Sequence, residues 1–512
     1  MNSDSNEKTQ DIPVPTKDEI RSAAEALHFN MSDADLELYT SFVAPMTSDY
    51  QVVESMNETK QPVKFAREKG YRPQQEENTL NAWYWKSVIN GAATGKLAGK
   101  RVVVKDNVCV AGMPMMNGSD VWQGFTPSQD ATVVSRVLEA GGQILGKAVC
   151  ENFCFSGGSH TSATGPVQNP HKSGYMSGGS SSGCAALLVA GECDMAIGGD
   201  QGGSIRMPSS FSGCYGIKPT YGLVPYTGAF PIDQGVDHLG PMANSTYDCA
   251  LMLEVLAGYD DGRDPRQDPR LGAKQYTAAL DGDAAGLNIG IVTEGFSTPS
   301  SQADVDEIVR TTALRFTEAG ASVSEVSIPA HTTAPSIMLA SMLDGTLATF
   351  TDFSGVGANP KGYAFTDAIQ FYNEKRKSRA DDMPVTVKTV LLFAYAMRER
   401  YGVYYSAKAN NLVRELRSSY DAALLNVDIL VMPTTVMKAL KIPGPNPGLE
   451  EVLSNALPMI GNTAPFDVTG HPSMSLPAGM SDGLPVGIML TGRAGEDDVV
   501  LRAGHALERL LG

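Results

Sequence analysis

The stretch MAIGGDQGGSIR, residues 195–206, decides the fold. Its first part, Met195–Gly198, is a short apolar run that predicts a strand. Four of the six residues from 198 to 203 are glycine, and glycines let the backbone approach a ligand with several N–H groups on one side. Ser204 ends this run. The sequence therefore predicts a serine nucleophile beside a nest of N–H donors that can bind an oxyanion.

A phosphate-binding loop is the competing interpretation of these glycines. No Gly-Lys-Ser or Gly-Lys-Thr triplet closes the loop, and the carboxylate of Asp200 would repel phosphate. We interpret Asp200 and Arg206, which flank the nucleophile, as an ion pair or hydrogen-bonded pair that holds the loop, and not as acid or base catalysts.

Outward from this stretch, apolar strand candidates alternate with amphipathic helices. The strand candidates are 101–105, 143–149, 195–198, 287–292, 321–328 and 427–432, and the helix candidates are 131–141, 245–258 and 305–319. Such alternation is typical of an α/β fold with a largely parallel or mixed sheet. Three long irregular segments, 156–183, 198–226 and 438–477, interrupt the pattern, and loops of this length usually build a site.

The first 95 residues follow a different pattern, which predicts an α-helical domain. Thr16 and Glu19 form a capping box that opens one helix, and Ser32 caps a second helix. The predicted domains are therefore an N-terminal α-helical domain, 1–95, and a catalytic domain, 96–512.

A second Gly/Ser segment, GGSSSG at 178–183, contains the pattern G-x-S-x-G centred on Ser181. This could be the nucleophile elbow of an α/β-hydrolase, which requires a strand directly before the serine and a histidine downstream. The preceding residues, HKSGYMS, are not strand-like, and no histidine after them has a distinctive setting. Taken alone, the motif leaves open both an elbow and a flexible loop.

Lys105 ends the apolar run RVVVK, residues 101–105. A lysine at the end of a strand is usually a solvated cap. If Lys105 is buried, desolvation favours the neutral amine, which could then accept a proton and act as a base.

These features together resemble the amidase signature family. Lys105, Ser180 and Ser204 are separated by 75 and 24 residues, which fits the family's motif spacing. The similarity continues in GIKPT (216–220), DHLGP (237–241), NTAPF (462–466), GHP (470–472) and GLPVG (483–487). Within the family, the chain is most similar to the enantioselective amidases encoded beside nitrile hydratases in actinobacteria. The segments that carry this closer similarity are 104–119, 198–206 and 222–232.

The resemblance implies a fold and a set of roles. The family fold is a mixed central sheet covered by helices on both faces. Ser204 would be the nucleophile, Ser180 the bridging serine and Lys105 the base, so that protons pass from Ser204 through Ser180 to neutral Lys105. The peptide bond before the bridging serine, Gly179–Ser180, is expected to be cis. The implied oxyanion donors are the N–H groups of Gln201, Gly202, Gly203 and Ser204, and the supporting residues are Ser181, Asp200 and Arg206.

The subgroup also implies a substrate class and an assembly. The expected substrate is a small aromatic or arylalkyl amide, hydrolysed to the acid and ammonia or an amine without a metal or organic cofactor. Phe155 and Ile460 are expected pocket walls, with Gln201 as a polar contact to the amide. We expect the helical domain to contribute to a homodimer and to shape the substrate entrance.

Two residues near the second loop depart from the family pattern GGSSGG. Ser182 replaces a glycine, and a serine there would be strained if the position required a positive φ. Cys184 follows, and it is either a small packed thiol or a redox-sensitive residue beside the site.

Composition limits the other partners. The net charge is −17, from 40 basic and 57 acidic residues, which disfavours nucleic acids and anionic membrane surfaces. No apolar run approaches the ~18 residues of a membrane span, and the N-terminal residues lack a signal-peptide pattern. Seven cysteines form no disulfide framework, so we expect a reducing cytoplasm. Cys150 and Cys154 lack a second Cys/His pair, which argues against zinc.

Three other functions compete with this interpretation. A glutaminase subunit of a tRNA-dependent amidotransferase shares the implied catalytic core, but the N-terminal helical domain and Gln201 argue against it. An ester or hydrazide hydrolase would use the same machinery. A non-catalytic binding protein would have no need of intact Lys105, Ser180 and Ser204.

Overall fold

The chain divides into two compact units. The computed structural model describes residues 11–270, 272–355 and 361–512, and the two units are Met1–Pro62 and Val63–Gly512. The sequence pattern predicts a boundary near residue 95 instead. The difference arises because residues 83–90 form a strand, β1 (Trp83–Asn90), which pairs with the central sheet and so belongs to the larger unit.

The smaller unit contains α1 (Lys17–Ala26), α2 (Asp33–Val43) and α3 (Met46–Glu54). Both predicted caps are present. Thr16 and Glu19 form a reciprocal capping box at α1, and Ser32 forms another with Asp35 at α2. Each box satisfies N–H groups that a helix start leaves without a partner.

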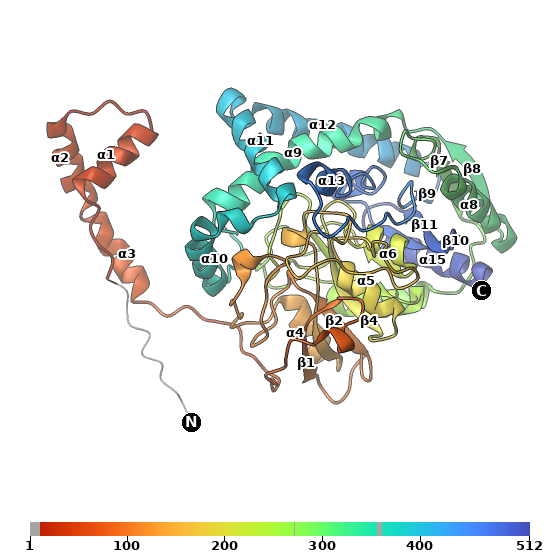
Figure 1. Ribbon diagram of the computed structural model, residues 1–512. Coiled ribbons are helices and arrows are strands. Elements are labelled where there is room, and N and C mark those ends of the chain that lie inside the picture. Colours follow the sequence, from red (N-terminus) through yellow and green to blue (C-terminus); the bar gives the residue numbers. More distant parts are fainter. Residues whose placement is uncertain (1–10, 271, 356–360) are drawn as a thin grey trace. The chain divides into compact units, whose positions relative to one another are not determined.

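The larger unit is built on a mixed β-sheet (Figure 1). Its strands are β1, β2 (Arg101–Lys105), β3 (Gln143–Ala148), β4 (Met195–Asp200), β5 (Tyr215–Lys218), β6 (His238–Ala243), β7 (Asn288–Val292), β8 (Ser322–Val326), β9 (Ile429–Pro433), β10 (Ser473–Ser481) and β11 (Leu484–Thr491). Their order across the sheet is β1-β3-β2-β4-β6-β5-β10-β11-β9-β7-β8. Strand β2 is parallel to β3 and β4, and β7 is parallel to β8 and β9, whereas the other pairs are antiparallel.

Helices cover both faces of the central strands. Every residue of β4, β6 and β11 is buried, and successive side chains of a strand point to opposite faces. The α-helices of the larger unit are α4 (Thr132–Glu139), α5 (Ser182–Val189), α6 (Arg206–Ser212), α7 (Thr246–Leu256), α8 (Ala303–Leu314), α9 (Ala334–Leu347), α10 (Thr366–Ser378), α11 (Val385–Tyr401), α12 (Tyr404–Leu424), α13 (Leu449–Ser454), α14 (Pro465–Thr469) and α15 (Asp497–Leu511). The predicted α/β class with a mixed sheet is confirmed.

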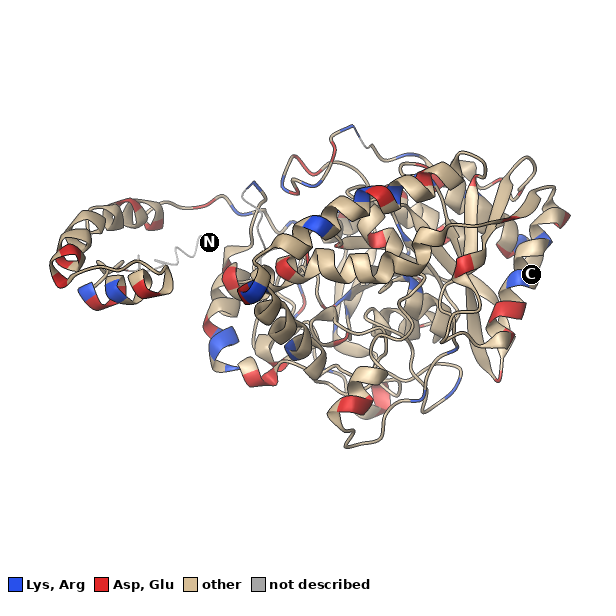
Figure 2. Ribbon diagram, turned by 90° about the horizontal axis from the view of Figure 1, so that it is seen from above, with Lys and Arg blue, Asp and Glu red and all other residues tan. Residues whose placement is uncertain are grey.

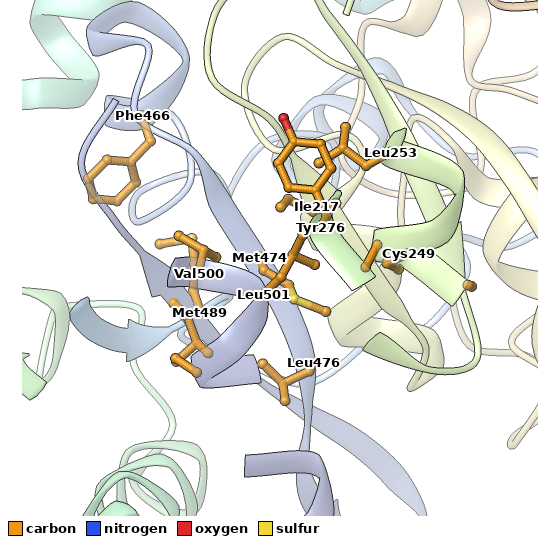
Figure 3. Close-up of a cluster of buried hydrophobic side chains, with 14 of the residues drawn as sticks. Ile217, Cys249, Leu253, Tyr276, Phe466, Met474, Leu476, Met489, Val500 and Leu501 are labelled. Carbon is orange, nitrogen blue, oxygen red and sulfur yellow. The ribbon is translucent and has the colours of Figure 1, made fainter. Parts of the chain in front are cut away.

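The hydrophobic core lies between the sheet and these helices. Figure 3 shows one part of it, where Met474 and Leu476 of β10 lie near Leu501 of α15 and Ile217 of β5. Helix α9 packs against both α11 and α12 (Figure 1), and α12 also contributes Leu416, Tyr420 and Leu424 to this core.

Charged residues of both signs are interspersed along the helices of the larger unit (Figure 2). None of the helices within the described ranges has the length and apolar character needed to cross a bilayer.

Candidate active site

Three chain segments meet where β2 and β4 end. The two strands are parallel and adjacent, with Val104 opposite Ile197, so their carboxyl ends lie at the same edge of the sheet. Lys105 is the last residue of β2. The loop after β4 carries Ser204, and the loop before α5 carries Ser180. Residues far apart in the sequence are thus brought together by strand order.

Lys105 and Ser180 are in direct contact. Nζ of Lys105 lies 2.8 Å from Oγ of Ser180 and 3.0 Å from the carbonyl oxygen of Gly199. Both side chains are fully buried, and within the described residues Lys105 forms no salt bridge. The peptide bond between Gly179 and Ser180 is cis. A neutral amine at this position would accept a proton from the Ser180 hydroxyl.

Ser181 connects the loop before α5 with the segment that follows β4 through hydrogen bonds. Its N–H donates to the carbonyl oxygen of Ser204 over 3.2 Å, and its Oγ hydrogen-bonds the backbone of Gly199. It follows a segment without strand structure and directly precedes α5. The strand that a nucleophile elbow requires before Ser181 is therefore absent. The hydrogen bonds of Ser181 to backbone groups instead suit a residue that supports the loops.

An ion pair holds the glycine loop. The carboxylate of Asp200 accepts from the Arg206 guanidinium through two hydrogen bonds of 3.0 Å, and it also accepts the N–H groups of Gly203 and Ile205. Burial opposes the ionisation of Asp200, but the adjacent Arg206 outweighs it and holds the pKa of Asp200 well below its usual range. The N–H of Gly203 is thus bound to Asp200. It is not available as the oxyanion donor that the resemblance implies, which leaves Gln201, Gly202 and Ser204.

A distant segment clamps the same loop. The hydroxyl of Thr463 donates to the carbonyl oxygen of Gly202 over 2.6 Å, and the Thr463 carbonyl accepts from Arg206. Asp467 accepts from Arg206 over 2.6 Å. Gly203 has φ +133°, and a Cβ there would come within 2.2 Å of the Thr463 hydroxyl. The sequence motif NTAPF contains Thr463, and Asp467 follows it directly, but the partners of these two residues were not predictable from spacing.

Ser204 opens into a cavity of about 320 Å³. Phe155, Gln201 and Ile460, the predicted substrate contacts, line this cavity. Sequence reasoning missed the other wall, which α9 supplies through Met338, Leu339 and Met342. The side chain of Gln201 also donates to the Tyr226 hydroxyl over 2.9 Å. Apart from three serines, Gln201 and the loop backbone, the cavity is lined mostly by apolar side chains.

The two departures from the family pattern are accommodated. Ser182 is the first residue of α5 and does not have a positive φ, so a serine fits without strain. Cys184 is fully buried, and burial raises the pKa of its thiol to about 12. Between the two interpretations of Cys184, its environment is that of a packed thiol.

The buried histidines have hydrogen-bond partners other than the proposed catalytic residues. His331 hydrogen-bonds Tyr420 and Asn462, His471 hydrogen-bonds Thr469 and Asp421, and His238 bonds the Val236 carbonyl. In the part of the chain that the structure describes, no group of three His, Cys, Asp or Glu side chains has a metal-binding arrangement.

Comparisons with known proteins point to one family. The protein family Amidase matches residues 72–501. The chain is 47% identical to an enantioselective amidase from Rhodococcus rhodochrous over 86% of this chain and 85% of that protein. It is 35% identical to a glutamyl-tRNA(Gln) amidotransferase subunit from Methanosarcina mazei, over 81% of this chain and 85% of the relative. The crystal structure of the corresponding subunit from Thermotoga maritima superposes with a TM-score of 0.70 at 27% identity, covering 85% of this chain and 88% of that one.

Proposed function

The chain belongs to the amidase signature family, and we propose that it hydrolyses small aromatic or arylalkyl amides through a Ser204–Ser180–Lys105 acyl-enzyme mechanism. Family membership and the close amidase relative make it an amidase, a hydrolase that acts on carbon–nitrogen bonds. The observation that carries the mechanism is the buried Lys105 amine, 2.8 Å from Ser180 and without a carboxylate partner among the described residues.

The proposed mechanism uses the contact between Lys105 and Ser180 as one link of a proton relay. Oγ of Ser204 attacks the amide carbon while its proton passes to Ser180 and the Ser180 proton passes to Lys105. Backbone N–H groups of Gln201, Gly202 and Ser204 bind the oxyanion, and one such donor is typically worth about 3–4 kcal/mol in the transition state. The relay then runs in reverse and protonates the leaving nitrogen. Water attacks the acyl-enzyme by the same route and releases the acid.

The cavity supports the proposed acyl group. Its volume of about 320 Å³ falls at the small end of ligand sites. Phe155, Ile460 and Met338 give it apolar walls that suit an aromatic ring. The side chain of Gln201 supplies a polar group near the loop, and we propose it as the contact to the amide.

A glutaminase subunit is the second candidate, favoured by the 35% identity to an amidotransferase subunit. The mainly apolar wall of the cavity argues against glutamine, whose carboxylate and ammonium need charged partners.

One substrate panel tests both candidates. Wild type is assayed against benzamide, phenylacetamide, a straight-chain amide, the matched esters and hydrazides, and glutamine. We expect the aromatic amides to turn over fastest. Ser204→Ala should lose essentially all turnover while folding normally, and a fluorophosphonate should label Ser204 in wild type and in Ser181→Ala. Labelling at Ser181 with Ser204 unmodified would overturn the assignment, and preferred turnover of glutamine would favour the second candidate.

We also propose a homodimer formed through the smaller unit, in the reducing cytoplasm. The smaller unit has apolar side chains that are more than half exposed: Leu38, Phe42, Met46, Tyr50 and Val53. Such a surface is typical of a protein interface. All seven cysteines are free and buried, which suits a reducing compartment. Light scattering of the full chain at micromolar concentration should give twice the chain mass, and a single-chain mass would contradict the dimer.

A further inference from the structure

Two thiols lie beside the proposed triad, against one buried amide. Cys150 and Cys154 each donate to Oδ1 of Asn117, over 3.8 and 3.5 Å, so the two thiols share one acceptor. Asn117 is fully buried, and its Nδ2 has no hydrogen-bond partner among the described residues. The proposed mechanism uses none of these groups.

Cys154 connects this cluster with the cavity. It interacts electrostatically with Ser180 and Lys105, and it lines the same cavity as Ser204. Cys154 and Ser204 have equal exposed fractions of 5%, whereas Cys150 behind them has none. A reagent that reaches Ser204 therefore enters a cavity that Cys154 also lines.

The surroundings of Cys154 favour its thiolate. Burial alone would raise the pKa of Cys154, but the neighbouring Cys150 and the charge that Lys105 carries in its protonated form outweigh burial and lower the pKa. The Asn117 amide can adapt to this change, because turning it over would present its unpartnered N–H groups to the sulfurs. Cys109 provides a contrast: it lines a different cavity, and burial raises its pKa to about 12.

We propose that Cys154 is a modification site for small carbon electrophiles that carry a carboxamide and enter the substrate cavity. The choice of a carboxamide rests on the proposed function. With iodoacetamide as the probe, the thiolate sulfur attacks the methylene carbon, the sulfur–carbon bond forms as the carbon–iodine bond breaks, iodide leaves, and the thiol proton passes to water. The resulting acetamide group occupies the space beside Lys105 and Ser180, so it blocks both the cavity and the proton relay.

The test is alkylation of the native full-length protein by limiting iodoacetamide near neutral pH, followed by peptide mass spectrometry. We expect Cys154 to react at least about tenfold faster than Cys109, because the thiolate fraction falls about tenfold for each unit of pKa above the ambient pH. Benzoate, which has the shape of a product acid, should slow the labelling. After alkylation, a fluorophosphonate should no longer label Ser204.

Two variants test why Cys154 reacts. Cys109→Ser, the matched control, should leave the Cys154 rate unchanged, and Lys105→Met should slow it several-fold because the charge of the protonated amine, which stabilises the thiolate before Lys105 acts as a base, is lost. The proposal is overturned if another cysteine reacts first, or if Cys154 stays unmodified in the native protein while the urea-unfolded chain is alkylated there. A protein that is labelled at Cys154 but hydrolyses no amide would instead refute the proposed function and retain the site.

Discussion

Two fully buried lysines on neighbouring strands have opposite surroundings. Lys105 ends β2, and Lys147 lies on β3 directly opposite Val104. Lys147 pairs with the carboxylate of Asp106 at 3.4 Å and also donates to the Val108 carbonyl. Among the described residues, Lys105 hydrogen-bonds only the Ser180 hydroxyl and the Gly199 carbonyl. A buried ammonium with a carboxylate is held in its charged form, whereas one without a carboxylate can become neutral. The first arrangement serves stability and the second leaves a base available.

The largest effect expected from this comparison is on the chemistry. Lys105→Met should lower amide turnover by about 10³-fold or more, because general-base catalysis contributes about 10²–10⁴, while the unfolding midpoint changes little. Lys105→Arg should fail as well, since a guanidinium stays charged. Turnover of each variant is measured by steady-state kinetics on the best amide. Urea unfolding serves as the control for folding. Activated esters should lose less, because their leaving groups need no proton. Near-wild-type amide turnover in Lys105→Arg would exclude this base.

The matched change on the neighbouring strand should affect stability instead. Lys147→Met leaves Asp106 as a buried carboxylate without its cation, and breaking such a pair costs about 3–5 kcal/mol. The urea midpoint should therefore fall, whereas turnover per folded molecule should stay close to wild type. Lost turnover with an unchanged midpoint would mean that the two lysines act together.

A smaller, pH-dependent effect should follow from Asp106. Burial raises the pKa of Asp106 from 3.8 to about 6, although Lys147 opposes the shift. Between these values the folded state binds a proton that the unfolded state releases, so this group's contribution to stability falls as pH rises through that window. Removing Lys147 should raise the pKa further. The stability deficit of Lys147→Met should therefore be smaller at pH 5 than at pH 8, by about 1.4 kcal/mol per additional pKa unit.

Urea unfolding of both proteins at the two pH values checks this prediction. The double variant Asp106→Asn/Lys147→Met is the control, since it has no carboxyl to titrate at this position. A Lys147→Met deficit that is equal at both pH values would show that Asp106 is not the group responsible.

Local sequence patterns predicted the helices and strands whose signals lie within a few adjacent residues. The apolar runs of β2, β4 and β9 and the caps of α1 and α2 depend on adjacent residues alone, and all were predicted. Strand β1 was missed because its pairing with β3 is irregular, with register shifts after Trp83 and Lys86. Helices α9, α11 and α12 were missed because α9 packs against the other two and also against other segments, which weakens a single apolar stripe.

The residues of the site also divide into those that local motifs predict and those that only the fold brings together. Lys105, Ser180 and Ser204 were identified by motif, since each stands in a recognisable run of residues. The sequence did not reveal three other features of the site. These are the hydrogen bond from Gly203 to Asp200, the clamp from Thr463 and the thiol of Cys154 near Lys105. Each of these depends on which side chain the fold brings to a loop, and no spacing in the sequence carries that information.

The clamp on the glycine loop also has a consequence for synthesis. Gly202 and Arg206 leave the ribosome 261 residues before Thr463 and Asp467. At typical rates of ~5–20 residues per second, this interval lasts about 13–50 s. During that time the loop lacks the Thr463 hydroxyl and the Asp467 carboxyl, although it has Asp200, and β5 has no β10 beside it. A nascent or truncated chain therefore holds every residue of the proposed triad but not the loop geometry, so amide hydrolysis should begin only when the final segments have docked.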